Sequence, residues 1–418
     1  MSETFRPETI DQLRDMLVWA VAEDKTIELV GSGSKRALGR PVRADHVVAM
    51  DRMAGITLYE PDELVLTAQP ATPMAEIEAA LAEARQHLEF EPPDYGPLLA
   101  APTAVAGKPA ANAGKGTIGG LIACNLAGPR RIKAGAARDH FLGFHGVSGR
   151  GEIFKSGGRV VKNVTGYDLS KLMAGSWGTL TAMTDVTVKV MPVPEKTRTV
   201  LLFGANVTAA GAVMSSALQS PHEVSGAAWL PADLASGSAV STVSGLRASV
   251  TAVRVEGPGP SVEYRCAALR EIFGTLGPTQ ELHSTNSAAF WREIRDVAPF
   301  ARPGDTRAVW KLSVAPTAGP KIVASLAAVD GVDAFLDWGG GLVWLALPEA
   351  EDAGLTTVRA AIPEGGGHAT LLRASEALRG RVEVFQPLAA GRAALTRRVK
   401  AAFDPKGILN PGRIHADL

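Results

Sequence analysis

Cysteine is scarce in this sequence: its 418 residues include only two, Cys124 and Cys266. The two lie far apart and form no Cys-x-x-Cys motif, so the chain carries no iron–sulfur or zinc motif of its own. Such low cysteine content also favours a reducing compartment, because disulfide frameworks need paired cysteines. The sequence therefore predicts no metal site and a chain of the cytosol.

Long apolar runs and an excess of one charge are also missing. No apolar run approaches the roughly 20 residues that span a bilayer, and the first residues, MSETFRPETIDQLRDML, are too polar for a signal peptide. The 43 basic side chains balance 43 acidic ones, which argues against nucleic acid as a partner. We expect a cytoplasmic chain with no direct membrane span; peripheral attachment to the inner membrane through partners is the alternative.

Glycine, in contrast, is abundant, and one stretch concentrates it with cations. The segment GSGSKRALG, residues 31–39, follows an apolar run that reads as a strand, and a second such run follows at 47–50. It lacks the order of a P-loop, and Arg36 stands where a Rossmann fingerprint needs its third glycine. The pattern predicts an anion cradle between two strands.

Three further stretches before residue 195 carry clear patterns. Apolar residues at helical spacing predict a helix over 8–23, and LVLTAQ at 64–69 predicts a strand. We expect Thr72 to cap the helix that follows this strand, with Pro73 at its first position. The glycine-rich segment 107–135 is longer than most loops without a function, and its small residues allow the backbone to approach a ligand closely. Within 159–192 a short helix should end at Gly175, before a half-buried strand around Val186.

The chain beyond Pro194 predicts a second α+β unit. Strands at 199–205, 224–230, 248–255 and 308–315 alternate with helices at 208–219, 262–274 and 319–328, and glycines 339–341 turn a hairpin. We expect a ferredoxin-like arrangement, with residues 233–247 as a mobile loop. Near the end, a helix stops at Asp404-Pro405, and Asn410-Pro411-Gly412 suits a type II turn.

Four of these segments together carry a family resemblance. GSGSKRALG, GTIGGLIACNLAG, GYDLSKLMAGSWGTLTAMTDVTVKV and FDPKGILNPGR resemble, in order and spacing, the vanillyl-alcohol-oxidase (PCMH-type) flavoproteins, and most of all the FAD-binding E subunits of bacterial glycolate oxidases. The resemblance implies an α+β fold: a PCMH-type FAD-binding domain of two α/β subdomains at 1–195, an α+β cap domain at 196–385, and a segment at 386–418 that returns to the flavin site.

In that superfamily the anion is the pyrophosphate of FAD, and the resemblance carries the contacts onto this sequence. The first loop would offer backbone amides, the second loop would close on the same phosphates, the Val186 backbone would meet the adenine side, and Asn410 would be carried back to the flavin ring. The implied cofactor-binding residues are Gly31, Ser32, Gly33, Ser34, Lys35, Gly39, Thr117, Gly119, Gly120, Asn125, Gly175, Gly178, Thr179, Val186 and Asn410. For each glycine the alternative is a plain need for positive φ.

The departures from the family shape the functional prediction. Many relatives attach FAD covalently through a histidine in the first loop; here that loop has none, and Cys124 reads as core, so we predict non-covalent FAD. Trp177 stands where many relatives have an acid, and we favour packing over flavin shielding. The cap motif His-x-Gly-Asp-Gly-Asn-x-His of hydroxyacid-oxidising relatives is absent.

The remaining polar residues give few candidates for a substrate site. His140 and His145 are poorly spaced to share a metal, and His368 reads as a solvated turn residue. A cation is needed for a substrate carboxylate, and the candidates are Arg292, Arg295 and Lys311, although the two arginines also suit an exposed helix face.

The resemblance implies a role in a multi-subunit glycolate oxidase or dehydrogenase, which oxidises glycolate, a small 2-hydroxy acid, to glyoxylate. The implied partners are a second FAD-containing catalytic subunit and an iron–sulfur subunit. The missing histidine motif favours electron relay or support for this chain. A stand-alone FAD-dependent hydroxyacid or alcohol dehydrogenase and a non-catalytic flavin-holding subunit are the alternatives.

Overall fold

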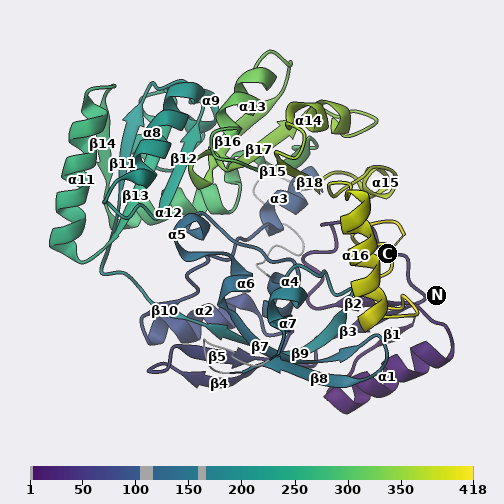
Figure 1. Ribbon diagram of the computed structural model, residues 1–418. Helices are drawn as coiled ribbons and strands as arrows, with labels where there is room; N and C mark the ends of the chain where they lie inside the picture. The colour runs from purple at the N-terminus through teal and green to yellow at the C-terminus, as the bar shows by residue number, and fades with distance from the viewer. Residues whose placement is uncertain (1–2, 104–115, 159–165, 418) are drawn as a thin grey trace.

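The computed structural model describes residues 3–103, 116–158 and 166–417. Its strands form four sheets of three, two, five and eight strands. Figure 1 shows the eight-stranded sheet with its helices as an upper lobe, and the smaller sheets as a lower lobe. No helix in these ranges is long and apolar enough to cross a membrane.

The three-stranded sheet positions the first glycine loop. Its order is β1 (Thr4–Phe5), β3 (His46–Ala49), β2 (Ile27–Val30), and β3 runs parallel to both neighbours. Helix α1 (Ile10–Ala22) begins at Thr9, whose side chain accepts a hydrogen bond from the Gln12 amide, and it buries an apolar stripe. The loop 31–39 then leaves the end of β2, so the strand–loop–strand prediction is confirmed.

The five-stranded antiparallel sheet forms the other half of the lower lobe. Its order is β4 (Ile56–Glu60), β5 (Val65–Ala68), β9 (Thr181–Lys189), β7 (Phe141–Ser148), β8 (Ile153–Gly157). The helices of this part of the chain are α2 (Met74–Glu83), α3 (Gly96–Ala100), α4 (Ile118–Ala123), α5 (Arg131–Ala134), α6 (Ala137–His140) and α7 (Leu169–Met173), of which α3 and α5 lie toward the upper lobe (Figure 1). A 3₁₀ turn, η1 (Ala101–Thr103), follows α3, and β6 (Gln86–His87) pairs with β10 (Met191–Pro192) as the link to the upper lobe.

The upper lobe contains two ferredoxin-like units side by side. The first is β11 (Lys196–Phe203), α8 (Val207–Gln219), β12 (Gly226–Leu230), β13 (Val250–Gly257), α11 (Gly259–Gly274), β14 (Thr279–Leu282). The second is β15 (Ala308–Val314), α13 (Gly319–Leu326), β16 (Asp333–Asp337), β17 (Leu342–Leu347), α14 (Leu355–Ala361), β18 (Gly367–Arg373). Their strands join in the order β14-β11-β13-β12-β16-β17-β15-β18. The ferredoxin-like prediction is confirmed, and the structure adds that the unit occurs twice.

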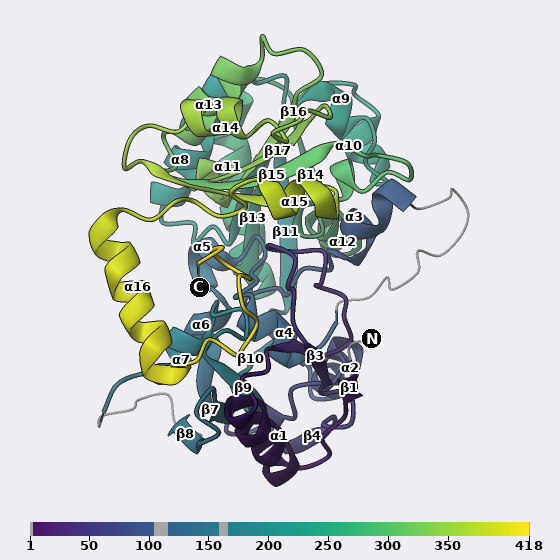
Figure 2. The same cartoon turned by 90° about the vertical axis from the view of Figure 1, so that its right-hand side faces the viewer.

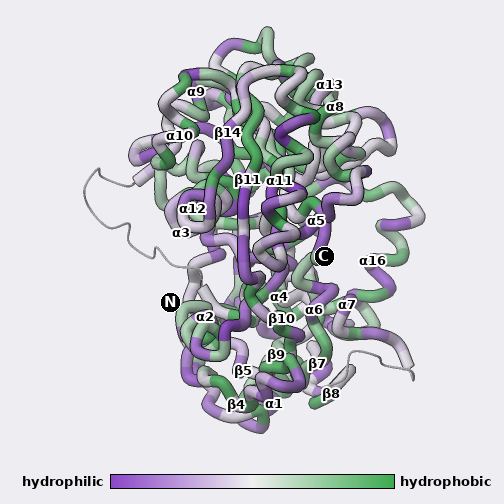
Figure 3. The backbone as a smooth tube through the Cα atoms, turned by 90° about the vertical axis from the view of Figure 1, so that its left-hand side faces the viewer, coloured by the Kyte–Doolittle hydropathy of each residue, from purple (hydrophilic) through white to green (hydrophobic). Residues whose placement is uncertain are grey.

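The two faces of this sheet have different neighbours. One face packs on α8, α11, α13 and α14, while residues of the other face share a hydrophobic core with the five-stranded sheet of the lower lobe. Helix α12 (Ser284–Arg295) lies on that second side, with η2 (Ala298–Phe300) after it. Figure 3 shows the hydrophobic segments gathered inside both lobes. The face that looks toward the lower lobe can therefore contribute side chains to a site between the lobes.

The C-terminal segment returns to the lower lobe, as predicted. After α15 (Glu376–Arg381), helix α16 (Ala390–Phe403) descends alongside the lower lobe (Figures 1 and 2). The chain then pairs with β2: the Ile27 amide donates to the Ile408 carbonyl, and the Asn410 amide donates to the Ile27 carbonyl. The end of the sequence is thus joined to the strand that carries the first glycine loop.

Several local predictions were wrong. Residues 233–247 include two short helices, α9 (Ala232–Ala235) and α10 (Ser241–Ser244), because Leu234 and Val243 are drawn into the core. Pro73, not Thr72, occupies the N-cap of α2, and the Thr72 hydroxyl instead bonds the Gly55 and Gln69 carbonyls. The strand β9 is buried on both faces rather than one, since its polar residues Thr181 and Thr187 are also buried.

Candidate functional site

A pocket of about 850 Å³ opens where the first glycine loop, α4 and the C-terminal segment meet. Most of the residues that the resemblance assigned to FAD line it: Gly31, Ser32, Gly33, Ser34, Lys35, Thr117, Gly119, Gly120, Gly178 and Asn410. They come from four places that are distant in the sequence, and the fold brings them to one cavity.

The first loop presents unpaired backbone donors. Within the described residues, the amide groups of Ser32, Gly33 and Ser34 have no protein acceptor, although they line the pocket. Gly33 has φ +76°, a conformation that glycine adopts without strain. Adjacent amides in such a bend form a concave donor array that suits an anion.

The second loop meets the first at close range. A Cβ on Gly31 would lie 2.8 Å from the Thr117 hydroxyl oxygen, so only glycine fits there. Thr117 is also the N-cap of α4, and its hydroxyl accepts from the Gly120 amide at 3.4 Å. The Gly119 amide donates to the Pro70 carbonyl, and a Cβ there would lie 2.8 Å from that oxygen. Gly119 and Gly120 thus shape the wall, while their amides already have protein acceptors.

The C-terminal turn closes the pocket through one buried side chain. The Asn410 side-chain oxygen accepts from the Leu29 amide at 2.8 Å, and its amide nitrogen donates to the Trp177 carbonyl at 2.7 Å. Gly178 leaves room for it, since a Cβ there would lie 2.6 Å from the Asn410 nitrogen. Asn410 therefore joins β2 to the turn after α7.

Arg413 is a pocket residue that the sequence reasoning missed. Its guanidinium donates to the carbonyls of Lys35 at 2.8 Å and Arg40 at 3.1 Å, which fixes the first loop from the C-terminal side. Burial lowers the pKa of both Arg413 and Lys35, so two cations in low dielectric surround the loop. The Asn-Pro-Gly-Arg turn was the signal available in the sequence, but only its asparagine was used.

Two further pocket residues were interpreted differently from the sequence. Cys124 lines the pocket and is partly buried rather than core, and burial raises the pKa of its thiol to about 11. Trp177 packs edge-on against Phe385 with ring centroids 5.2 Å apart, as expected, but it also lines the pocket. Its φ of +57° turns the chain toward Gly178.

Two of the predicted glycines lie outside the pocket lining, where the backbone conformation explains them. Gly39 has φ +69°, and its carbonyl accepts from Arg379 at 2.7 Å. Gly175 has φ +86° and donates its amide to the Ile122 carbonyl at 3.1 Å. At these positions the structure supports the need for positive φ.

Three other predicted residues also lie outside that lining. Asn125 accepts from the Arg138 amide at 3.0 Å, and the Thr179 hydroxyl donates to the Ser176 carbonyl at 2.7 Å. Val186 is buried in β9, with paired strands on both sides. A backbone flanked by two ladders has little freedom to meet a ligand.

The three candidate substrate cations are in different surroundings. Arg292 is exposed on α12, as an ordinary helix face would have it. Arg295 is occupied by Asp296 through two hydrogen bonds of 2.8 Å. Lys311 is partly buried on β15, and its ammonium lies 5.1 Å from the ring centroid of Trp338 in η3 (Trp338–Gly340). Only Lys311 remains available on the face between the lobes.

The histidines do not converge on a metal. His140 bonds the Ala134 carbonyl at 2.9 Å, and His145 pairs with Asp185 at 2.7 Å. Among the described residues no cluster of three or more His, Cys, Asp or Glu side chains could hold a metal ion. His368 is exposed, as expected, but it belongs to strand β18 and not to a turn.

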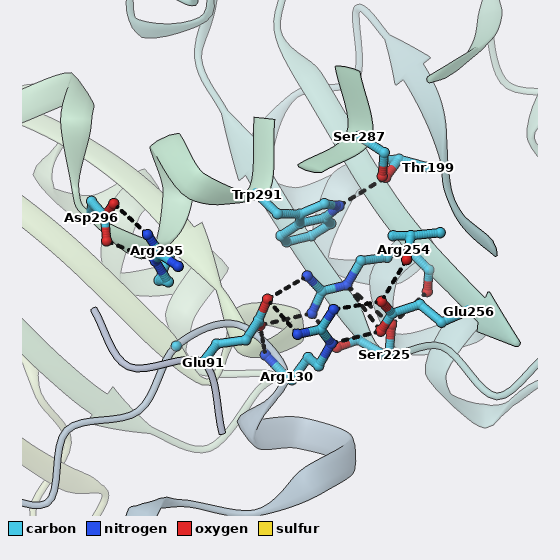
Figure 4. Close-up of polar contacts among 12 residues, drawn as sticks. Glu91, Arg130, Thr199, Ser225, Arg254, Glu256, Ser287, Trp291, Arg295 and Asp296 are labelled. Carbon is cyan, nitrogen blue, oxygen red and sulfur yellow. Dashed lines mark hydrogen bonds and ion pairs between the residues drawn. The ribbon is translucent and has the colours of Figure 1, made fainter. Parts of the chain in front are cut away.

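A buried ionic cluster joins the two lobes (Figure 4). Glu91 accepts two hydrogen bonds of 2.9 Å from Arg254 of the upper lobe, and Arg130 of the lower lobe donates to Glu256 at 2.7 and 2.8 Å. Trp291 covers the Arg254 guanidinium at 4.6 Å. This crossed pairing fixes the upper sheet over the lower lobe.

Comparison with known proteins identifies the fold and the family. Residues 2–116 match the FAD binding domain family, and residues 388–414 match the C-terminal domain of FAD linked oxidases. Solved structures with the same fold include p-cresol methylhydroxylase with bound substrate (TM-score 0.71, 15% identity, 99% of this chain and 88% of that one) and 4-ethylphenol oxidase from Gulosibacter chungangensis (TM-score 0.70, 14% identity, 99% and 89%). At these identities the likeness concerns the fold alone.

Two curated relatives carry the comparison further. Glycolate oxidase subunit GlcD of Bacillus subtilis (strain 168) is 30% identical over 212 residues, which are 50% of this chain and 41% of that protein. Glycolate oxidase subunit GlcE of Escherichia coli (strain K12) is 33% identical over 402 residues, which are 96% of this chain and 95% of that protein. Because that likeness extends over nearly the whole of both sequences, this chain belongs to the GlcE family of FAD-linked glycolate oxidase subunits.

Proposed function

We propose that this chain binds FAD non-covalently in the two-loop pocket and serves as a flavin-bearing subunit of a complex that oxidises glycolate to glyoxylate. The observation that carries the proposal is the first loop, where the amides of Ser32, Gly33 and Ser34 have no acceptor among the described residues and line a cavity that the C-terminal turn and Arg413 close. Residues 1–195 would hold the cofactor, 196–385 would cover it, and 386–418 would close the site.

The residues present fit a dinucleotide. Three unpaired amides and the cations Lys35 and Arg413 suit the two negative charges of a pyrophosphate. A Cβ on Gly120 would lie 3.5 Å from the nearest protein atom, so the protein itself does not require glycine at this position. The absence of a side chain there instead leaves room for a ligand. The apolar wall of Met50, Val42 and Trp177 suits ring systems.

Non-covalent binding follows from the nucleophiles at hand. The first loop contains no histidine. Cys124 is the thiol of the pocket, and with a pKa of about 11 it stays protonated near neutral pH, which makes it a poor nucleophile.

The reaction removes a hydride from C2 of glycolate and a proton from its hydroxyl, and leaves glyoxylate. Bound FAD supplies the hydride acceptor. The chain's own part would be to hold the phosphates with the first loop, Lys35 and Arg413 and to pack the ring system against Met50, Val42 and Trp177. We propose that electrons then pass to an iron–sulfur partner, and that a second flavoprotein subunit and this chain work in one complex, which would reach the inner membrane through such partners.

The test is a visible spectrum of the purified chain before and after anaerobic glycolate, with acid precipitation to release the flavin. Released colour supports non-covalent FAD, and bleaching by glycolate would make this chain a dehydrogenase in its own right. Flavin that stays oxidised places substrate oxidation on a partner. A chain that never binds flavin contradicts the proposal.

A matched pair of variants separates the pocket from the fold. Gly120→Ala adds a methyl that the protein tolerates but a bound dinucleotide would meet; Gly274→Ala adds one at the end of α11, where no atom lies within 4 Å. We expect flavin content to fall in the first variant and to stay at the wild-type level in the second.

A further inference from the structure

Two cations, one from each lobe, stack against the same indole ring. The Arg131 guanidinium carbon, on α5 of the lower lobe, lies 4.3 Å from the ring centroid of Trp338. The Lys311 ammonium, on β15 of the upper sheet, lies 5.1 Å from that centroid and 5.7 Å from that of Trp344. Like charges gathered at one apolar surface repel each other, so the arrangement calls for an anion.

The indole is fixed against the glycine-rich segment that carries the second loop. Trp338 is buried, and its ring nitrogen donates to the Gly128 carbonyl at 3.0 Å. Gly128 closely follows Cys124, which lines the pocket at the end of α4. The two cations therefore lie where the upper sheet meets the second glycine loop.

Neither cation has a carboxylate partner in the described ranges. No ion pair or hydrogen bond is formed by the side chains of Arg131 or Lys311 there, whereas the preceding residue, Arg130, is paired with Glu91 and Glu256. The ranges outside the description, residues 1–2, 104–115, 159–165 and 418, contain no aspartate or glutamate in the sequence. In the described part of the chain the two cations thus lie near acidic side chains, Asp139 for Arg131 and Asp337 for Lys311, without forming a hydrogen bond or ion pair with either.

The nearest acids are engaged elsewhere. Asp139 accepts from the Ala136 amide at 2.8 Å, and Asp337 accepts from the Trp338 amide at 2.7 Å. Burial raises the pKa of Asp337 to about 7, so it carries only part of a negative charge near neutral pH. On the neighbouring strand β18, His368 has its pKa lowered by partial desolvation of its ring and by the charges of Lys311 and Arg131. The surroundings of the pair are therefore cationic overall.

We propose that Lys311 and Arg131 bind the carboxylate of a small 2-hydroxy acid, or of its 2-oxo product, beside the Trp338 ring. Guanidinium and ammonium groups give charge-assisted hydrogen bonds to carboxylate oxygens, and the indole rings keep water from the pair. The inference rests on the proposed function, since it supplies the substrate end of the site whose cofactor end is the two-loop pocket. It also selects Lys311 over Arg292 and Arg295.

The test titrates the flavin-loaded chain with oxalate. Oxalate replaces the 2-hydroxy acid because it is a planar carboxylate that the flavin cannot oxidise. Flavin absorbance and tryptophan fluorescence report binding, and chloride at equal ionic strength is the blank. Lys311→Met and Arg131→Gln should each weaken oxalate binding about tenfold or more, as loss of a charge-assisted hydrogen bond predicts. Lys133→Gln, on the same short helix as Arg131, and Lys321→Met, on α13, should bind like wild type.

The outcomes distinguish the two proposals. A wild-type chain without flavin contradicts the proposed function. A flavin-loaded chain that shows no saturable response to oxalate overturns the carboxylate site alone. So do Lys311 and Arg131 variants that bind oxalate as wild type does, and so does a Lys311 variant that changes the flavin spectrum yet keeps its oxalate affinity.

Discussion

Replacement of Glu91 by glutamine should destabilise the junction between the lobes. Glu91 is 10% exposed and its partner Arg254 only 1%; Glu91 also lies 3.0 Å from the Arg130 guanidinium. Four charges balance in this cluster, and Glu91→Gln leaves two arginines against the single carboxylate of Glu256. Removal of one partner from a buried ion pair costs about 3–5 kcal/mol, because the remaining charge stays out of water.

The expected change in melting temperature follows from chain length. Unfolding entropies near 2.1 cal/mol/K per residue, applied to 418 residues, turn that cost into a decrease of about 3–6 °C if the two lobes unfold together. Differential scanning calorimetry measures it. Glu223→Gln is the control, since the Glu223 side chain is 67% exposed and pairs with Lys133 at 3.3 Å and with Arg265 at 3.9 Å, and exposed pairs of this kind contribute about 0–1 kcal/mol.

A double variant tests whether the lost stability comes from unbalanced buried charge. Adding Arg130→Met to Glu91→Gln restores charge balance and should recover part of the lost stability. If Glu91→Gln melts within about 1 °C of both wild type and the Glu223→Gln control, the buried cluster contributes little and the argument from burial is wrong.

Four further predictions concern pH and the pocket. Burial raises the carboxyl pKa of Glu91, but Arg254 and Arg130 lower it more strongly, so the folded pKa lies below the ordinary 4.5. The stability that Glu91 provides should therefore be complete above pH 4.5 and should be lost as the pH falls through the folded pKa, which thermal melts at a series of pH values measure. Burial and the Arg131 charge lower the pKa of Lys311 to about 8, the Asp337 charge opposes the shift, and Arg131 and His368 are the neighbours that face Lys311. Because only the protonated ammonium attracts an anion, oxalate should bind below pH 8, and its affinity should fall above pH 8 in the same titration. Asn410→Ala removes two hydrogen bonds from a buried site, so it should lower stability by about 1–3 kcal/mol in urea titration and reduce flavin content. Cys124, with its pKa of about 11, should react slowly with iodoacetamide at pH 7 and more slowly still when FAD fills the pocket, by mass spectrometry.

The parts of the site that the sequence predicted are those with local causes. The loop 31–39 is rich in glycine, serine and cationic residues, a composition that suits an anion-binding loop, and its flanking apolar runs are strands. The Asn-Pro-Gly turn likewise predicted a fixed C-terminal element, and the resemblance predicted its return to the lower lobe. Backbone requirements of this kind are read from single residues and their immediate neighbours.

The ionic cluster between the lobes could not be predicted in this way. Glu91 and Arg254 are 163 positions apart, and nothing near either residue indicates the other. Such a pair is decided by how two sheets pack, which depends on many apolar contacts at once. The same applies to Arg413, whose acceptors are carbonyl groups that any residue could supply.

Two errors show tertiary packing overriding local composition. The serine- and glycine-rich segment 233–247 predicted a loop, yet Leu234 and Val243 are buried in the core, and burial of such side chains outweighs weak helix propensity. The alternation around Val186 predicted a half-buried strand, yet Thr181 and Thr187 are buried as well, because β9 is the middle strand of its sheet.

The flavin pocket is completed by the last residues of the chain, and one buried pair makes this possible. The Lys400 ammonium donates to Asp404 at 2.6 Å and to the carbonyls of Thr179 at 2.8 Å and Leu409 at 3.0 Å, while Asp404 accepts from the amides of Ile408 and Leu409. Both charges are almost inaccessible to solvent, so every donor and acceptor must be matched or the pair is destabilising. That requirement fixes the turn at Asn410 against β2 and the turn after α7, and both contribute residues to the pocket lining. A ligand that contacts the first loop and Arg413 together should therefore stabilise the C-terminal segment in this position, because it binds only where the two are held together.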